Sequence, residues 1–286
     1  MMTPRSLIAA SLALILAAPS AFADDEARPV DPKAQAAELI AAFKSDSPEL
    51  RVKAVQAAKD NQHSSLTSPL VKMLSDKEWG VREAAMEALA AREDKAAKKK
   101  ASSSIASRLR RLSKDPDATD ELLQAIDALG TLAQPAAVKP LLDDITLETD
   151  IQIVRARFMA VAEIPDKKAI EGLIDFLAKG RRGGAGPQRD AARKALQYAT
   201  GADAPREHRQ SGKDADRWRA WWRENEKHFD FEAVKAARAQ AEAEAAAKAE
   251  RKREQKEKRE QRKRDKESRG KKKQGGGDKP QQGDGA

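Results

Sequence analysis

The residue types that most often carry out chemistry are few in this sequence and lie far apart. The three histidines, His63, His208 and His228, show no H-x-x-x-H or H-E-x-x-H spacing, which would place two zinc ligands on one helix face. The serine run Ser102–Ser104 lacks the glycines of a nucleophile elbow. The chain has no cysteine, which excludes disulfides, thiolate metal sites and cysteine nucleophiles. We therefore expect no catalytic residue, no metal and no cofactor, and we predict that the protein is not an enzyme.

Arginine side chains are stronger candidates, for binding rather than for catalysis. Arg51, Arg82 and Arg155 each follow an apolar residue and precede a run of alanines. They are candidates to bind an acidic partner. The alternative is that each arginine pairs with an aspartate of a neighbouring repeat and forms a ladder along the fold. We favour the ladder, because contacts between repeats stabilise repeat proteins.

A tryptophan cluster near residue 220 is a second candidate surface. Trp218, Trp221 and Trp222 are spaced so that they share one face of a helix. Such a face can stack on a sugar, a base or an apolar ligand. Their place at the end of the helical region favours a hydrophobic cap instead, because the last repeat of an array exposes an apolar face that must be covered.

The glycine-rich loop Gly180–Gly186 (GRRGGAG) is a third candidate. It contains Arg181 and Arg182 and is followed by Pro187, a favoured residue for the first turn of a helix. Free backbone amides at such a start, together with the two arginines, make a candidate anion site. No Gly-Lys-Ser/Thr follows, so this is not a phosphate-binding P-loop. The interpretation that we favour is a flexible loop between helices.

These candidates lie within a long region, residues 33–230, in which apolar residues recur every three or four positions, as expected of helices. A short pattern of small and apolar residues recurs within it at steps of 31, 40, 33 and 34 residues. A period of about 30 to 40 residues is typical of two-helix repeats stacked into a solenoid. The recurring pairs are Ala57-Ala58, Ala88-Leu89, Ala128-Leu129, Val161-Ala162 and Ala195-Leu196.

The best-formed repeat contains Val81-Arg82, then Ala84, Ala85, Ala88 and Leu89, with Asp76 upstream. This pattern resembles the second helix of a HEAT or HEAT-like repeat, of the type found in phycobilin lyases. The resemblance implies an all-α fold, a right-handed α-solenoid of about five helix pairs. The third and fifth pairs depart from the pattern, since both lack the Val-Arg dipeptide. The five pairs are expected at about 33–62, 64–94, 96–132, 135–163 and 167–200.

The segment 199–229 resembles the W-x-x-W-W ending of many secreted bacterial HEAT-repeat proteins, in which it closes the array. The resemblance therefore implies a Trp-rich C-terminal capping helix.

The two ends of the chain differ from the repeat region. Arg5, an apolar run and small residues at Ala21 and Ala23 predict a signal peptide at 1–23, followed by a linker at 24–32. Residues 231–286 carry 18 Lys and Arg against 11 Asp and Glu, so they hold +7 of the net charge of +9. We expect a charged helical extension at 231–269, supported by acid-to-base pairs at i, i+4, and a disordered tail at 270–286. The repeat region itself is nearly neutral.

The functional expectation follows from this organisation. We expect an exported, periplasmic or secreted scaffold that binds another protein through the solenoid surface. One alternative is contact with an anionic polymer, the cell envelope or a membrane surface through the basic tail, residues 251–273. A less favoured one is an enzyme of the lyase or DNA-glycosylase type, as known among HEAT-like proteins. We expect no small-molecule substrate and, because of the predicted export, no intracellular nucleic acid. The partner, the pathway and the oligomeric state do not follow from the sequence.

Overall fold

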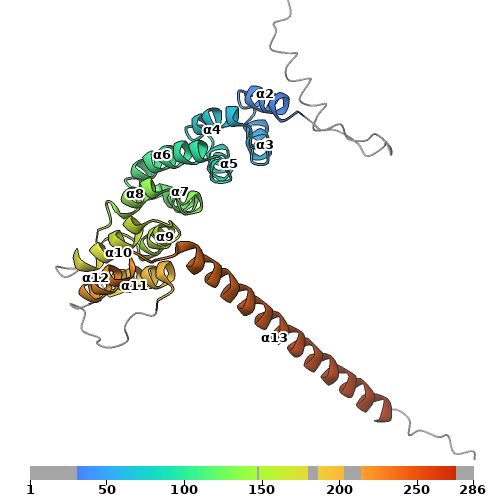
Figure 1. Ribbon diagram of the computed structural model, residues 1–286. Coiled ribbons are helices and arrows are strands. Elements are labelled where there is room, and N and C mark those ends of the chain that lie inside the picture. Colours follow the sequence, from blue (N-terminus) through green and yellow to red (C-terminus); the bar gives the residue numbers. More distant parts are fainter. Residues whose placement is uncertain (1–30, 147, 180–185, 203–213, 275–286) are drawn as a thin grey trace, which may run out of the picture. The chain divides into compact units, whose positions relative to one another are not determined.

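The computed structural model describes residues 31–146, 148–179, 186–202 and 214–274, with side chains described to residue 262 in the last range. Within these residues every regular element is a helix (Figure 1). The chain divides into two compact units, Met1–Phe231 and Glu232–Ala286, which we describe separately. The predicted signal peptide and most of the linker that follows it lie outside the described residues.

The first unit contains eleven described α-helices, and three of them are preceded by a 3-10 turn. These helices are α4, α7 and α8, and the turns that lead directly into them are η1 (Ser64–Leu66), η2 (Pro116–Ala118) and η3 (Pro135–Ala137). The helices are α2 (Pro32–Ala42), α3 (Pro48–Ala57), α4 (Thr67–Met73), α5 (Trp79–Ala90), α6 (Lys95–Leu112), α7 (Thr119–Leu132), α8 (Val138–Leu142), α9 (Ile151–Ala162), α10 (Lys167–Lys179), α11 (Gly186–Thr200) and α12 (Asp214–Asn225).

Several of these helices begin at a residue whose side chain caps the free backbone amides of the first turn. The Ser47 hydroxyl accepts a hydrogen bond from the Leu50 amide at the start of α3, and the Asp94 carboxylate accepts one from the Ala97 amide at the start of α6. Asp150 does the same for two amides of α9. Each cap is worth about 1 kcal/mol and fixes where its helix begins.

The helices pack in two layers. Each even-numbered helix contacts the odd-numbered helix that follows it, from α2 with α3 to α10 with α11. The odd-numbered helices also contact one another in order, from α3 to α11, and the even-numbered ones do so from α4 to α12. The two rows are visible in Figure 1. This is the arrangement in which each repeat packs mainly on its immediate neighbours.

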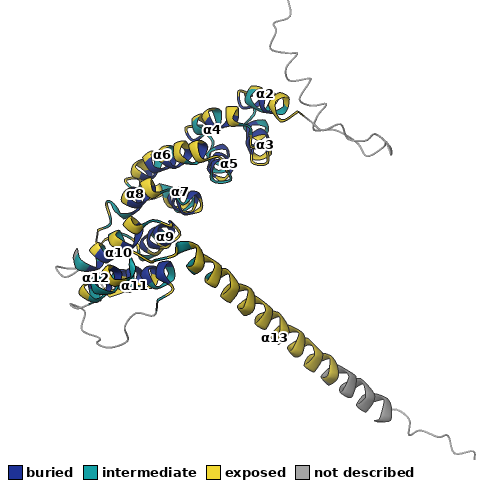
Figure 2. Cartoon of the chain, in the orientation of Figure 1, coloured by how far each residue is buried: buried dark blue, intermediate teal, exposed yellow. Residues whose placement is uncertain are grey.

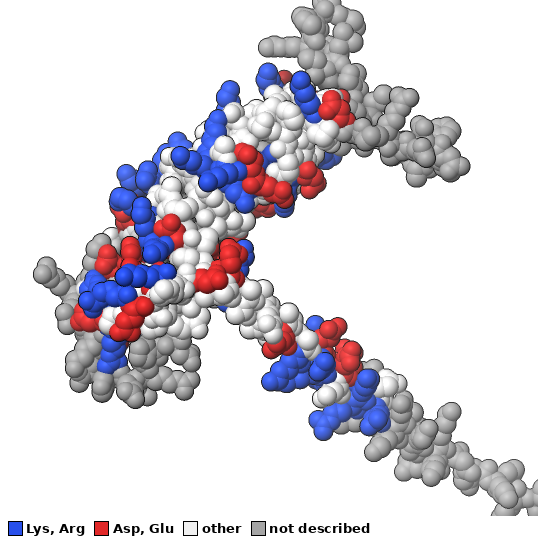
Figure 3. Space-filling view, viewed as in Figure 1, with Lys and Arg blue, Asp and Glu red and all other residues white. Residues whose placement is uncertain are grey.

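The core lies between the two rows and is built largely of alanine and leucine (Figure 2). Small residues let the helices of one row approach closely. A Cβ atom on Gly130 of α7 would lie 3.1 Å from the Ala160 Cα in α9, closer than most such contacts, so glycine favours this approach. Charges of both signs cover the visible face of this unit (Figure 3). With so little net charge in residues 24–230, apolar burial has no large repulsion to overcome.

One buried cation joins the first repeats to each other. Arg92, at the end of α5, is 1% exposed and donates to the backbone carbonyls of Ala58, Asn61 and Ala88. Burial lowers the pKa of Arg92, because a charged guanidinium is less well solvated there than in water. The carbonyls at the end of α3 carry the negative end of that helix dipole, which partly offsets the cost. The sequence pattern did not reveal this role.

The fourth pair begins with a short helix. Residues 135–163 were predicted to hold a helix pair, and in the structure its first helix, α8, ends at Leu142. Asp143 is extended and Asp144 has a φ of 60°, a left-handed conformation that stops a helix. Lys139 pairs with the Asp143 carboxylate at 2.7 Å across this end. The remaining turn of helix still contacts α6, α9 and α10.

The second unit consists mostly of one helix, α13 (Phe231–Gln274), 44 residues long. Nearly all of its described side chains from Glu232 to Arg262 are exposed (Figure 2). The helix continues past the boundary at residue 269 at which composition predicted disorder to begin. Residues 275–286 of the predicted disordered tail lie outside the described residues. No helix in the described part of the chain is both long and apolar enough to span a membrane.

Candidate functional site

Arg51, the first candidate binding residue, is used inside the repeat array. Its Nε and Nη2 atoms donate to the Asp76 carboxylate at 2.8 and 2.9 Å, and its Nη1 donates to the carbonyls of Ser45 and Asp46. The side chains of both partners are less than a tenth exposed. Burial by itself would raise the pKa of Asp76, but the hydrogen bonds from Arg51 and the Glu78 amide bring it below its ordinary value. This pair joins successive repeats, as the ladder hypothesis expected.

Arg82 repeats the same arrangement one pair further along. Its Nη1 donates to the carbonyls of Asp76 and Lys77, and its Nη2 donates to the Glu121 carboxylate at 2.8 Å. Arg108 of α6 binds the other oxygen of that carboxylate. The buried Glu121 of α7 therefore holds two arginines from two different helices. The ladder hypothesis expected an aspartate here and did not single out either Glu121 or Arg108.

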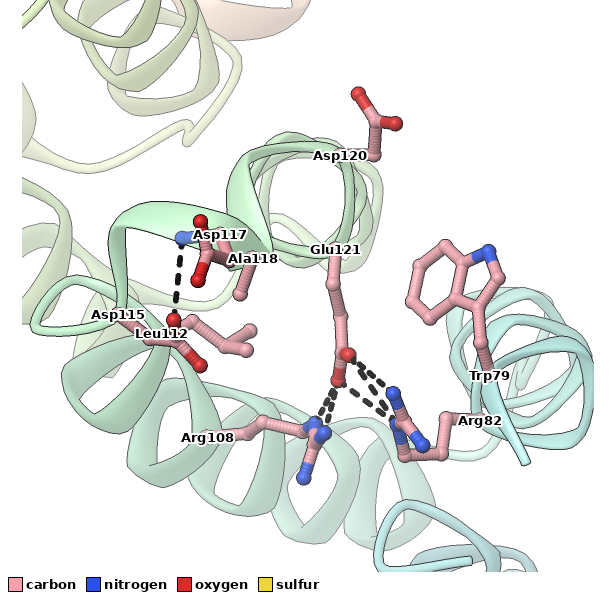
Figure 4. A pocket seen from close by; sticks show the side chains of 9 residues that line it. All are labelled: Trp79, Arg82, Arg108, Leu112, Asp115, Asp117, Ala118, Asp120 and Glu121. Carbon is pink, nitrogen blue, oxygen red and sulfur yellow. Dashed lines mark hydrogen bonds and ion pairs between the residues drawn. The ribbon is translucent and has the colours of Figure 1, made fainter. Parts of the chain in front are cut away.

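A pocket of about 400 Å³ lies beside this charge cluster, between α5, α6 and α7 (Figure 4). Glu121 and its two arginines meet in it, and the indole of Trp79 stands next to Arg82. The Arg82 guanidinium carbon lies 5.6 Å from the centre of the Trp79 ring, within the range of a cation–π contact. The pocket is lined by Trp79, Arg82, Arg108, Leu112, Asp115, Asp117, Ala118, Asp120 and Glu121.

Three exposed aspartates, Asp115, Asp117 and Asp120, give the pocket an acidic edge. They come from the turn before α7 and from its first residues. The Asp115 carboxylate accepts the Asp117 amide at 3.1 Å, which holds the turn η2 in place. With the buried carboxylate matched by two arginines, these three carry charge that no cation in the pocket lining neutralises. The pocket as a whole has four carboxylates against two guanidinium groups.

An aromatic wall beside exposed carboxylates favours a particular kind of ligand. The aliphatic stem of a lysine or arginine can lie along an indole ring while its charged end reaches a carboxylate. The arrangement does not suit a metal ion, since no group of three or more His, Asp or Glu among the described residues could hold one. It also offers no nucleophile next to a base. The exposed carboxylates of the lining could accept hydrogen bonds from a basic side chain of a ligand.

Trp79 is a further residue of this site, besides Glu121 and Arg108, that the sequence analysis did not identify. It lies outside the tryptophan cluster at 218–222, and the repeat motif begins two residues after it, at Val81. The available signal was its setting, because Trp79 is a large aromatic residue at the start of a helix and directly follows two charged residues, Lys77 and Glu78. In the structure Trp79 is half-buried.

The third arginine of the predicted ladder, Arg155, does not join it. Arg155 is exposed and forms no ion pair with a residue that the structure describes. Arg51 and Arg82 lie four residues after the cap of their helix, whereas Arg155 lies five residues after Asp150. One residue turns a side chain by about 100° around a helix. The ladder prediction was therefore wrong at Arg155.

Arg157 takes the buried position in the fourth pair. Its Nη1 donates to the Asp143 carbonyl at 2.7 Å, and its Nη2 donates to the Ser113 hydroxyl at 2.5 Å. Burial lowers the pKa of Arg157, and the nearby Asp144 and Asp143 oppose this effect. Arg157 thus binds a backbone carbonyl and a hydroxyl group, whereas Arg51 and Arg82 bind a carboxylate of the neighbouring repeat.

The tryptophan cluster is largely buried. Trp218 and Trp222 are 2% and 4% exposed on α12, which packs on α10. Trp221 is half-buried, and its ring centre lies 5.7 Å from that of Trp218 and 6.1 Å from that of Phe229. These residues form an aromatic cluster within the fold and present no open stacking face. Arg181 and Arg182, with the loop at 180–185, lie outside the described residues.

Residues 36–111 match the family of HEAT repeats. The match begins within α2 and ends within α6, and it contains Arg51, Asp76, Arg82 and Arg108. Comparison with curated proteins finds no match for this chain. The resemblance predicted from the sequence is therefore confirmed for residues 36–111, which are similar to HEAT repeats.

Proposed function

We propose that the protein is an exported, non-enzymatic scaffold that binds a partner protein through its helical array, at the pocket beside Trp79. HEAT repeats generally mediate protein–protein interaction, and a match to them covers two of the three helices that form the pocket. The observation that carries the proposal is the combination, in one pocket, of the half-buried Trp79 with three exposed aspartates. The partner would insert a lysine or arginine side chain.

The finer architecture is part of the same proposal. The five predicted helix pairs form one right-handed solenoid, and α12 is its Trp-rich cap. The ordered contacts along both rows of helices support a continuous stack, and the burial of Trp218 and Trp222 against α10 supports the cap. A cap of this kind covers the apolar face of the last pair and keeps the array soluble.

Export rests on the sequence of residues 1–23. The basic start, the apolar run and the small residues before Asp24 are those of a cleaved signal peptide. N-terminal sequencing of the protein isolated from its native host should begin at Asp24. Recovery of the uncleaved chain from the cytoplasm would contradict export and would leave the binding proposal standing.

The binding proposal is tested by matched variants of the pocket. Crosslinking of the exported protein in its native host, followed by identification of the captured chain, should yield a defined partner. Asp117→Asn with Asp120→Asn should weaken binding of that purified partner about tenfold or more, since each variant removes a charge from the acidic edge. Asp127→Asn, an exposed aspartate of α7 outside the pocket, is the control and should leave the affinity within about twofold.

Three outcomes would overturn this proposal. Equal affinity of the pocket variant and the Asp127 control for the partner would place the binding surface elsewhere. Catalytic turnover by the purified chain that is lost when the pocket is altered would make the protein an enzyme. Loss of binding only when residues 232–286 are removed would assign the interaction to the second unit.

A further inference from the structure

The charges of α13 are divided between two faces of the helix. Successive residues of a helix are turned by about 100°, so positions along residues 250–262 can be placed around its axis. Six basic residues fall within an arc of about 160°, and no acidic residue of this segment falls within it. These six, which we call the basic face, are Arg251, Lys252, Lys256, Lys258, Arg259 and Arg262.

The acidic residues of the same segment, Glu250, Glu254, Glu257 and Glu260, lie on the remaining part of the circumference. Figure 3 shows Lys and Arg along one side of the described part of α13 and acidic residues mostly along the other. In the linear sequence the acids are interspersed among the bases. The helix shows that the interspersed acids are kept off one face.

Within the basic face, neighbouring side chains repel one another. Lys252 and Lys256, and also Lys258 and Arg262, are spaced at i, i+4, so each pair carries like charges one helical turn apart. All six side chains are exposed. No salt bridge joins any of them to a residue whose side chain the structure describes. An anionic surface against this face would relieve that repulsion.

The chemistry of the face narrows the kind of surface. Residues 251–262 contain no apolar side chain, so the helix cannot insert into the hydrocarbon of a membrane. They also contain no aromatic residue on which the bases of a single-stranded nucleic acid could stack. What remains is charge attraction over a broad arc, which suits a flat array of anions better than a thin chain. The head groups of anionic phospholipids form such an array.

We propose that the basic face of α13 binds the surface of a bilayer that contains anionic phospholipids, with the acidic face turned toward water. The proposal concerns the second unit and is independent of the pocket beside Trp79. It goes beyond the attraction of a basic tail to polyanions, because it requires that binding depend on where the charges lie and not on their sum.

Two exchanges of neighbouring residues separate position from net charge. Arg259→Glu with Glu260→Arg puts a carboxylate in the middle of the basic face. Arg253→Glu with Glu254→Arg makes the same exchange entirely outside the face. Both variants keep the composition and net charge of the protein, and circular dichroism of each full chain should show unchanged helix content.

Binding of the full chain is measured by cosedimentation with vesicles of phosphatidylcholine and phosphatidylglycerol, and with vesicles of phosphatidylcholine alone. The wild type and the Arg253/Glu254 exchange should bind the mixed vesicles equally, less tightly as salt is raised, and should not bind the neutral ones. The Arg259/Glu260 exchange should bind roughly fivefold more weakly or worse, as expected for loss of a basic contact at an anionic surface.

Three results would overturn the proposal. Equal binding by both exchange variants would show that only net charge matters. Equal binding to neutral and mixed vesicles would exclude an electrostatic contact. Binding of duplex DNA that depends on the Arg259/Glu260 exchange, with no binding to mixed vesicles, would assign the face to a nucleic acid instead.

Discussion

At the scale of single residues, Arg51 and Arg82 of the first repeats each perform two tasks. The guanidinium of Arg51 binds two carbonyls in the loop before its own helix and the carboxylate of Asp76, which lies between the two helices of the next pair. Arg82 does the same with the Asp76 carbonyl and the Glu121 carboxylate. Because a planar guanidinium donates in several fixed directions, one side chain can hold a loop and a neighbouring repeat together. Lysine could not make this set of bonds.

The residue that tests this ladder is Asp76, in an Asp76→Asn variant. At neutral pH the variant should lose about 2 kcal/mol of unfolding free energy, because Arg51 keeps its buried charge without a carboxylate. The pKa of Asp76 is lowered in the folded protein, so its stabilising contribution is present above the pKa of the unfolded chain and is lost as the pH falls through the folded pKa. Urea denaturation at a series of pH values should therefore show the difference shrinking below a pH of about 4.

Glu87→Gln is the control for this measurement. Glu87 pairs with Lys59 at 3.7 Å, and both side chains are about half exposed. Such pairs are worth about 0 to 1 kcal/mol, so this variant should change little at any pH. If the loss in Asp76→Asn were the same at low and neutral pH, the carboxylate charge would not be its cause.

At the scale of elements, the sequence predicted the helical class and the pairing because both follow from periodic burial. Apolar residues at three- and four-residue spacing and a repeat of about 30 to 40 residues carry that information directly. The prediction failed where it depended on the position of the motif relative to the start of its helix. Arg155 matched the motif by type, but its helix begins one residue earlier relative to it, which turned its side chain outward. The length of α8 could not be predicted, because its end depends on the conformation of Asp143 and Asp144.

The candidate pocket was beyond sequence reasoning for a related reason. Arg82 was singled out, but its partner Glu121 lies 39 residues away on another helix, and Arg108, which binds the same carboxylate, lies on a third helix. Only the stacking of α5, α6 and α7 brings the three together with Trp79. No local pattern marks Glu121, which stands at the position of α7 where α5 has Val81.

Close packing of α7 on α9 gives a prediction at this scale. Gly130→Ala should lower the unfolding free energy by about 1 to 3 kcal/mol, because the added methyl meets the backbone of Ala160 and forces the helices apart. Gly80→Ala in α5 is the matched control. There the added Cβ would lie 3.6 Å from Val52 Cγ2, an ordinary contact, so the better helix propensity of alanine should leave stability unchanged or raise it by up to about 1 kcal/mol. Thermal unfolding of both variants distinguishes the two sites, and equal effects would show that Gly130 is not a packing requirement.

At the scale of the whole molecule, the chain contains two units that are stabilised in different ways. The first has a continuous core and little net charge. The second is one long, exposed helix without a core of its own. A helix of this kind is held by its backbone hydrogen bonds and local side-chain pairs, so it unfolds gradually along its length. A packed repeat array loses its structure more cooperatively, because each pair depends on its neighbours.

Deletion of residues 232–286 should therefore remove a gradual transition and leave a cooperative one. The far-ultraviolet circular dichroism of the full chain should decline steadily on heating, from α13, and then fall in a sigmoidal step, from the array. The truncated chain should keep that step at the same temperature within about 2 °C, because the deletion takes away almost none of the buried apolar surface that determines it. A shift of the step to lower temperature would show that α13 stabilises the array, and a single sigmoidal transition in the full chain would show that the two units unfold as one.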